Sequence, residues 1–138
     1  FNVVPGRARV ALECRSADAE ELDALEAALL AAARREAEAG GLALDAAAVG
    51  NWEPTTLDRS VQQAIAGAAR ALGLNAVEIV SGAGHDAQAL AAVTRSGMAF
   101  VPSVGGVSHD PAEHTAWPDC VNGANVLLGA ALTLAGAV

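Results

Sequence analysis

The order of apolar and polar residues along the chain predicts four extended segments. Residues 7–15 alternate, with apolar side chains on one face and arginine and glutamate on the other, as is typical of a half-buried strand. Residues 42–49 predict a second strand after a helix. The short apolar runs at 77–80 and 98–101 are of the continuous kind that is buried in parallel sheets.

Between these segments the apolar positions repeat at helical spacing. Aspartate is a preferred N-cap, because its carboxylate accepts hydrogen bonds from the free N–H groups of the first helical turn. Three aspartates precede such periodic stretches and are predicted to be caps: Asp18, Asp58 and Asp86. Glycines predict where the first two helices end, at Gly40-Gly41 and at Gly73. The third helix is expected to reach Arg95, and a fourth is expected over residues 121–136.

Alternation of helices and strands after residue 57 predicts an α/β fold. In such folds, functional loops follow the carboxyl ends of the strands. His85 and His109 both follow predicted strands, and His109 lies in a loop of about eighteen residues (102–119), a length more often functional than idle. We therefore expect the two histidines to share a site. The strand, helix and strand before this part predict a separate subdomain that ends near residue 55.

Composition narrows the class of protein. The net charge of −8 argues against nucleic acid as a partner, because phosphates require a basic surface. No apolar run reaches the ~20 residues of a membrane-spanning helix, so no membrane partner is expected. Cys14 and Cys120 form no disulfide framework, which favours a reduced, cytoplasmic protein. Much of the 53% apolar fraction is alanine, so the hydrophobic core should be thin.

His109 is the sharpest candidate for chemistry. Neutral imidazole is a good ligand for zinc, manganese or nickel, and the preceding Gly105-Gly106 permit a close approach of backbone to a ligand. The alternative from spacing alone is a loop histidine bonded to a carboxylate. Glu113 is expected to brace the loop or to orient His109. His114 is expected to be a surface residue.

Two other residues could contact a substrate. His85 stands in a glycine-rich turn at a predicted helix start, where an imidazole can donate a hydrogen bond to developing negative charge; the alternative is a polar turn residue. Arg15 lies on the polar face of the first strand, where a guanidinium can bind a carboxylate with two hydrogen bonds or pair with an acid of the protein.

Three sequence motifs carry a family resemblance: NVVPG (2–6) followed by Arg15, SGAGHDA (81–87) and GVSHDPAE (106–113). In this order they resemble the C-terminal portion of the hydantoinase/carbamoylase family of amidohydrolases, which contains N-carbamoyl-L-amino acid hydrolases and allantoate amidohydrolases and belongs to the dinuclear-zinc peptidase clan. The resemblance implies a metal-dependent enzyme that hydrolyses the carbamoyl or ureido C–N bond of N-carbamoyl amino acids, allantoate or similar ureido acids and releases ammonia.

The resemblance also implies roles for individual residues. His109 matches the family's final metal ligand. His85 matches a histidine that contacts the substrate or the tetrahedral intermediate, and so is a catalytic and substrate-binding candidate. Asn2 and Arg15 match an asparagine and an arginine that bind substrate. Two divalent metal ions (Zn, Mn, Ni or Co) are implied per assembled site, with only one ligand, His109, in this chain.

The implied architecture has two parts. Residues 1–57 resemble the second half (strand, helix, strand) of an α+β, ferredoxin-like lid and dimerisation domain. Residues 58–138 resemble the C-terminal part of a zinc-exopeptidase-like catalytic α/β domain. A homodimer through the lid is implied. The general base and the other metal ligands belong to family motifs that precede those seen here, so the chain alone is expected to be inactive.

Two other functions stay open. The same dinuclear-metal clan contains aminoacylases and dipeptidases, which act on different amide bonds. A lid with part of its scaffold can also act as a non-catalytic dimerisation module.

Overall fold

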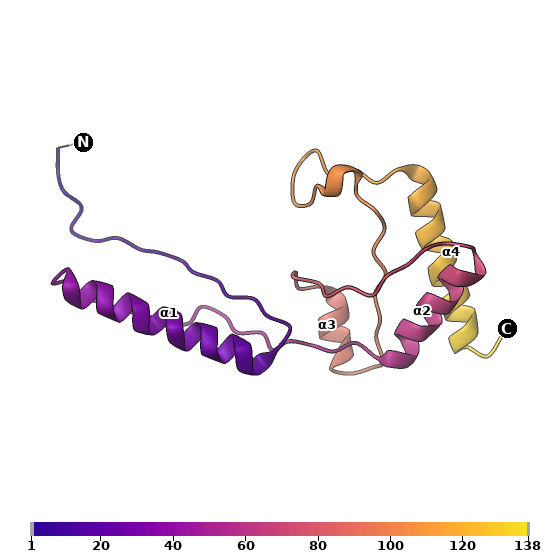
Figure 1. The fold of residues 1–138 in the computed structure, drawn as a ribbon, viewed down its shortest axis with the longest axis horizontal. Coiled ribbons are helices and arrows are strands. Elements are labelled where there is room, and N and C mark those ends of the chain that lie inside the picture. The colour runs from indigo at the N-terminus through magenta and orange to yellow at the C-terminus, as the bar shows by residue number, and fades with distance from the viewer. Residues whose placement is uncertain (1, 138) are drawn as a thin grey trace. The chain divides into compact units, whose positions relative to one another are not determined.

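The computed structural model describes residues 2–137 and divides into two compact units, Phe1–Pro54 and Thr55–Val138. The predicted boundary at residues 57 and 58 lies close to this division. Four α-helices and one short 3-10 helix are assigned among the described residues (Figure 1): α1 (Ala19–Ala39), α2 (Arg59–Ala71), α3 (Asp86–Ala91), η1 (Val104–Gly106) and α4 (Trp117–Leu134).

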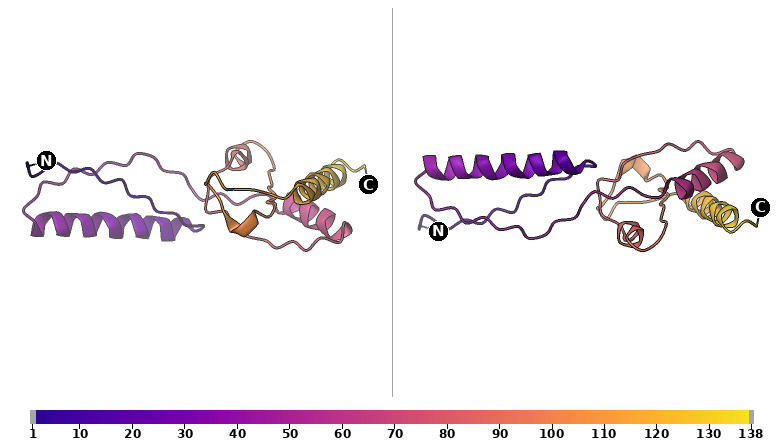
Figure 2. Two further views of the ribbon diagram at one scale, coloured as in Figure 1. Left: turned by 90° about the horizontal axis from the view of Figure 1, so that it is seen from above. Right: turned by 90° about the horizontal axis from the view of Figure 1, so that it is seen from below.

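The first unit is one long helix with an extended segment on either side. Asp18 caps α1, and its carboxylate accepts a hydrogen bond from the backbone N–H of Glu21 at 2.9 Å. The helix ends at Gly40, and Gly41 follows with a φ of 63°, as the sequence predicts. Both flanking segments run along α1 in the direction opposite to the helix (Figures 1 and 2).

The prediction of four strands is wrong for the described residues. The segments 7–15, 42–49, 77–80 and 98–101 run as chain without a strand assignment. A strand requires a ladder of backbone hydrogen bonds to a neighbour, and none of the hydrogen bonds between backbone groups of residues 2–137 forms such a ladder. Segment 77–80 is also not buried, since 76% of Val77 and 64% of Ile79 is exposed.

The second unit has its core between α2 and α4, which pack against each other side by side (Figure 2). Their small side chains allow a close approach: an ideal Cβ on Gly129 of α4 would lie 3.1 Å from Cβ of Ala68 of α2. Among residues 2–137 four apolar residues are buried, and three of them are alanine, so the core is thin, as composition predicts: Ala64, Ala69, Val126 and Ala130.

The chain segments that lead to the two histidine-bearing loops are tied to this helix pair. The backbone N–H of Asp58, the cap of α2, donates to the carbonyl of Ser96 at 2.9 Å. Arg59, the first residue of α2, donates through Nη1 to both carboxylate oxygens of Glu78, at 2.8 and 2.9 Å.

Segment 98–101 passes so close to α4 that a Cβ on Gly123 would lie 2.5 Å from Val101 Cγ1. Both loops therefore follow segments that contact α2 or α4.

Two helix boundaries differ from the predicted ones. The N-cap of α3 is His85 rather than Asp86, and α3 ends at Ala91 rather than at Arg95. Asp86 is the first helical residue, so its carboxylate lies in the first turn instead of preceding it. Helix α4 begins at Trp117 rather than at Val121, because Pro118 fits the first helical turn, where no N–H bond is lost. No helix among residues 2–137 is long and apolar enough to cross a membrane.

Candidate active site

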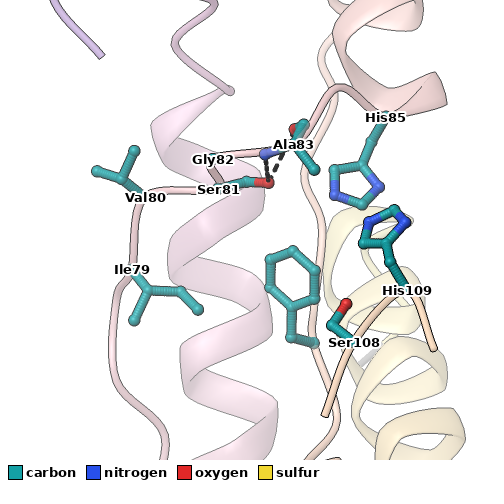
Figure 3. A pocket seen from close by; sticks show the side chains of 9 residues that line it. Ile79, Val80, Ser81, Gly82, Ala83, His85, Ser108 and His109 are labelled. Atoms are coloured by element: carbon teal, nitrogen blue, oxygen red, sulfur yellow. Dashed lines mark hydrogen bonds between the residues drawn. The ribbon is translucent and has the colours of Figure 1, made fainter. Parts of the chain in front are cut away.

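His85 and His109 line the same pocket of the second unit. The pocket is open to solvent, has a volume of about 230 Å³ and contains side chains from three stretches of chain: Ile79, Val80, Ser81, Gly82, Ala83, His85, Phe100, Ser108 and His109. Both imidazoles lie on the same side of it (Figure 3). The expectation from sequence that these two loops lie together is therefore met in the geometry.

His85 is held by the turn that precedes α3 and by an aromatic neighbour. Ser81 shapes the turn, because its hydroxyl donates to the carbonyl of Ala83 at 2.9 Å and accepts from the N–H of Ala83 at 3.2 Å (Figure 3). The His85 ring makes an edge-to-face contact with Phe100, with ring centroids 5.4 Å apart and planes at 69°. The His85 side chain makes no capping hydrogen bond to α3. Its imidazole is thus directed to the pocket rather than used to start the helix.

His109 stands in the loop between η1 and α4 with a left-handed backbone, φ 57°. It is the non-glycine residue with positive φ among residues 2–137, and this conformation persists only where the surroundings hold it. Glu113 supplies one such contact, because its Oε2 accepts a hydrogen bond from the backbone N–H of His109 at 2.8 Å. Asp110 closes the same turn by accepting from the N–H of Ala112 at 2.8 Å. His114 is exposed.

Asn2 and Arg15 belong to the first unit, and both are exposed. Arg15 Nε donates to Glu13 Oε1 at 2.6 Å. This hydrogen bond and the charge of Arg15 lower the pKa of Glu13, and the same two effects of Glu13 raise the pKa of Arg15. Arg15 is therefore a permanent cation whose guanidinium already contacts a carboxylate of its own segment.

The described residues do not make a complete metal site. No group of three or more His, Cys, Asp or Glu side chains within residues 2–137 is placed to hold a metal ion. His109 fits the role of one ligand, since its imidazole lines an open pocket and its backbone, not its ring, makes the contact with Glu113. Within this pocket, the imidazoles of His109 and His85 provide the ring nitrogens that could bind a metal ion or a substrate.

The apolar residues that line the pocket were not predicted from the sequence as part of the site. Ile79, Val80 and Phe100 were expected to be buried strand residues, yet they line the pocket beside the histidines. Phe100 is one of two phenylalanines in the chain and lies close before the histidine-bearing loop, which is a signal that could have suggested a contact with the site.

Comparison with known proteins supplies the family. Peptidase family M20/M25/M40 matches residues 14–133, so the chain belongs to this family. Within the family, the chain is 38% identical over 134 residues to an N-carbamoyl-L-amino-acid amidohydrolase of Rhizobium meliloti, covering 97% of the chain and 32% of the relative. It is 32% identical to the allantoate amidohydrolase of Escherichia coli over 91% of the chain and 31% of the relative.

A solved structure agrees with these relatives. The crystal structure of an amidase of the hydantoinase/carbamoylase family from Burkholderia multivorans superposes with a TM-score of 0.78 at 38% identity, covering 86% of the chain and 29% of the solved one. The resemblance seen in the three motifs is thus confirmed. The chain spans about a third of the length of the curated relatives it matches.

Proposed function

We propose that this chain forms part of a metal-dependent amidohydrolase that hydrolyses the carbamoyl or ureido C–N bond of N-carbamoyl amino acids, allantoate or similar ureido acids and releases ammonia. The observation that carries the proposal is the shared pocket of His85 and His109, built from two separate loops. The amidohydrolase relatives support the reaction class. A cytoplasmic location is part of the same proposal.

The two histidines take different roles in this proposal. A divalent metal ion, when bound, would supply Lewis-acid activation of water and of the scissile carbonyl, and His109 would be one of its ligands. His85 donates a hydrogen bond to the oxygen on which negative charge develops. The edge contact with Phe100 limits rotation of the His85 ring, so this donor is oriented before substrate arrives. Glu113 keeps the backbone of His109 in its left-handed conformation.

Asn2 and Arg15 are proposed to bind the polar ends of the substrate. Arg15 binds the carboxylate that all these ureido acids share, and Asn2 binds the ureido group or the carboxylate. Because Glu13 already accepts a hydrogen bond from Arg15, a substrate carboxylate replaces or joins Glu13 at the guanidinium, which has five N–H donors. The first unit is proposed to be half of a ferredoxin-like lid through which a homodimer forms, and the second to be part of the catalytic α/β domain.

A second candidate function is an aminoacylase or dipeptidase, which the peptidase name of the matched family favours. Both candidates use the same kind of site, and they differ in the bond that is cleaved. A non-catalytic dimerisation module is the third, and it predicts a dimer that hydrolyses nothing.

A substrate panel tests these candidates. The protein expressed from its complete reading frame is incubated with Mn²⁺ or Zn²⁺ and an N-carbamoyl amino acid, allantoate, an N-acetyl amino acid or a dipeptide. Hydrolysis is followed by ammonia release for the two ureido acids and by release of the free amino acid for the other two substrates. We expect kcat/KM for the N-acetyl amino acid and the dipeptide to be at least about tenfold lower than for the ureido acids. A higher kcat/KM for the N-acetyl amino acid or the dipeptide would contradict the proposal and would favour an aminoacylase or dipeptidase. The 138-residue chain by itself is expected to release no ammonia, because its described residues hold no complete metal site.

A further inference from the structure

Ser103 stands where the histidine-bearing loop leaves the last extended segment. Its hydroxyl donates to the carbonyl of Val107 at 2.5 Å and lies 3.5 Å from the carbonyl of His114. A serine hydroxyl has one proton, so the short contact to Val107 is the hydrogen bond and the longer one is at the limit of the range. The side chain is thus located between the outgoing and the returning arms of the loop.

The backbone closes the loop at the same point. The N–H of Val104 donates to the carbonyl of His114 at 2.8 Å, which joins the two ends of the loop directly. The N–H of Gly106 donates to the carbonyl of Ser103 at 3.0 Å and closes the turn of η1. A surface loop of this length whose ends lie together is an Ω-loop. Residues 103–114 are called the His109 loop below.

The His109 loop holds its histidine from two sides. On the returning side, Glu113 accepts from the N–H of His109, and the N–H of Glu113 donates to the carbonyl of Asp110 at 2.9 Å. On the outgoing side, Gly105 and Gly106 have φ values of 67° and 69°, which glycine adopts without steric cost. The bond from Ser103 to Val107 spans these two glycines. It is the side-chain contact that fixes the outgoing arm, two residues before His109.

We infer that Ser103 is a positioning residue: its hydroxyl closes the outgoing arm of the His109 loop and so sets the direction of the His109 imidazole into the pocket. The link to metal binding rests on the proposed function, whereas the effect on the loop does not. Ser103 itself does not line the pocket, so it acts through the backbone.

The test compares Ser103→Ala with Ser103→Thr, which keeps the hydroxyl, in the protein expressed from its complete reading frame. Amide hydrogen exchange of residues 103–114 is measured together with the affinity for added Mn²⁺. For Ser103→Ala we expect exchange at Val104 and His109 to rise at least about tenfold with α2 and α4 unchanged, and Mn²⁺ affinity to fall about tenfold, as for other residues that orient a metal ligand. Ser103→Thr should keep both values within about twofold.

The outcomes separate the two claims. Unchanged exchange in Ser103→Ala overturns the inference, as does raised exchange with full Mn²⁺ affinity. A wild-type protein that binds no Mn²⁺ and cleaves no ureido acid overturns the proposed function, while exchange still decides whether Ser103 holds the loop. If Ser103→Ala also raises exchange in α2 and α4, Ser103→Cys is used instead, because a thiol is close in size to the hydroxyl and a weaker donor. We then expect a smaller rise in exchange that is confined to the His109 loop.

Discussion

At the scale of single residues, the second unit depends on places where a missing side chain lets two segments touch. Gly123, inside α4, lies against Val101, and an added Cβ would be 2.5 Å from Val101 Cγ1. Gly67, inside α2, has only the end of the flexible Arg70 side chain near its Cβ position, at 3.9 Å. Each glycine lies inside a helix, but the surroundings of the two positions differ, so they make a matched pair for substitution.

Substitution of these glycines by alanine should have opposite effects on stability. Gly123→Ala should lower the free energy of unfolding by about 1–3 kcal/mol, because Val101 must move. Gly67→Ala should raise it by about 0.4–1 kcal/mol, because alanine restricts the unfolded chain and favours helix. Urea unfolding measures both. Adding Val101→Ala to Gly123→Ala should restore part of the loss, and equal effects of the two single substitutions would argue against this packing.

At the scale of elements, what depends on near neighbours in sequence could be predicted and what depends on distant partners could not. Asp18 and Asp58 were predicted as caps and are caps, because a cap bonds N–H groups two or three residues away. The prediction that Asp86 is the N-cap of α3 is wrong, because α3 begins one residue earlier than predicted and Asp86 is its first helical residue. The strand predictions failed because alternation at 7–15 and apolar runs such as 77–80 report a preference for extended chain, whereas a strand also needs a hydrogen-bonded partner, which the local pattern does not supply.

The site is an exception in one respect. The expectation that His85 and His109 share a site rested on their places after predicted strands, and both line one pocket although no strand forms among residues 2–137. The bond from Ser103 to Val107 and the ring contact of His85 with Phe100 could not be predicted, because each depends on the exact path of a loop rather than on spacing.

The cap of α2 predicts a pH dependence. The hydroxyl of Ser60 and then the backbone N–H of Val61 bond to the carboxylate of Asp58 and lower its pKa. Because the folded pKa lies below the unfolded one, the stabilisation is present above about pH 4 and is lost as the pH falls through the folded value. Asp58→Asn should therefore lower Tm at pH 7, and its difference from wild type should shrink below pH 4. Thermal unfolding across pH checks this. Asp45→Asn is the control, because Asp45 is an exposed aspartate outside the helices. A difference that stays constant with pH would contradict it.

At the scale of the whole molecule, the chain belongs to a peptidase family and spans about a third of its curated relatives. Its second unit brings together two histidines of different loops, and its first carries Arg15 paired with Glu13. We propose different roles for these two histidines of one pocket: His109 would bind metal, and His85 would contact the reacting group. His114 offers an internal comparison, because it lies in the same loop and the described contacts there use its backbone carbonyl.

The most direct test is the bound metal of three variants, His109→Ala, His85→Ala and His114→Ala, in the protein expressed from its complete reading frame. Metal per protein is measured after loading with Zn²⁺ and gel filtration, alongside kcat for ammonia release. We expect His109→Ala to lose about one metal ion and its activity. His85→Ala should keep its metal and lose at least about a hundredfold in kcat, and His114→Ala should keep both. Full metal in His109→Ala, or metal loss in His85→Ala, would refute the proposed roles.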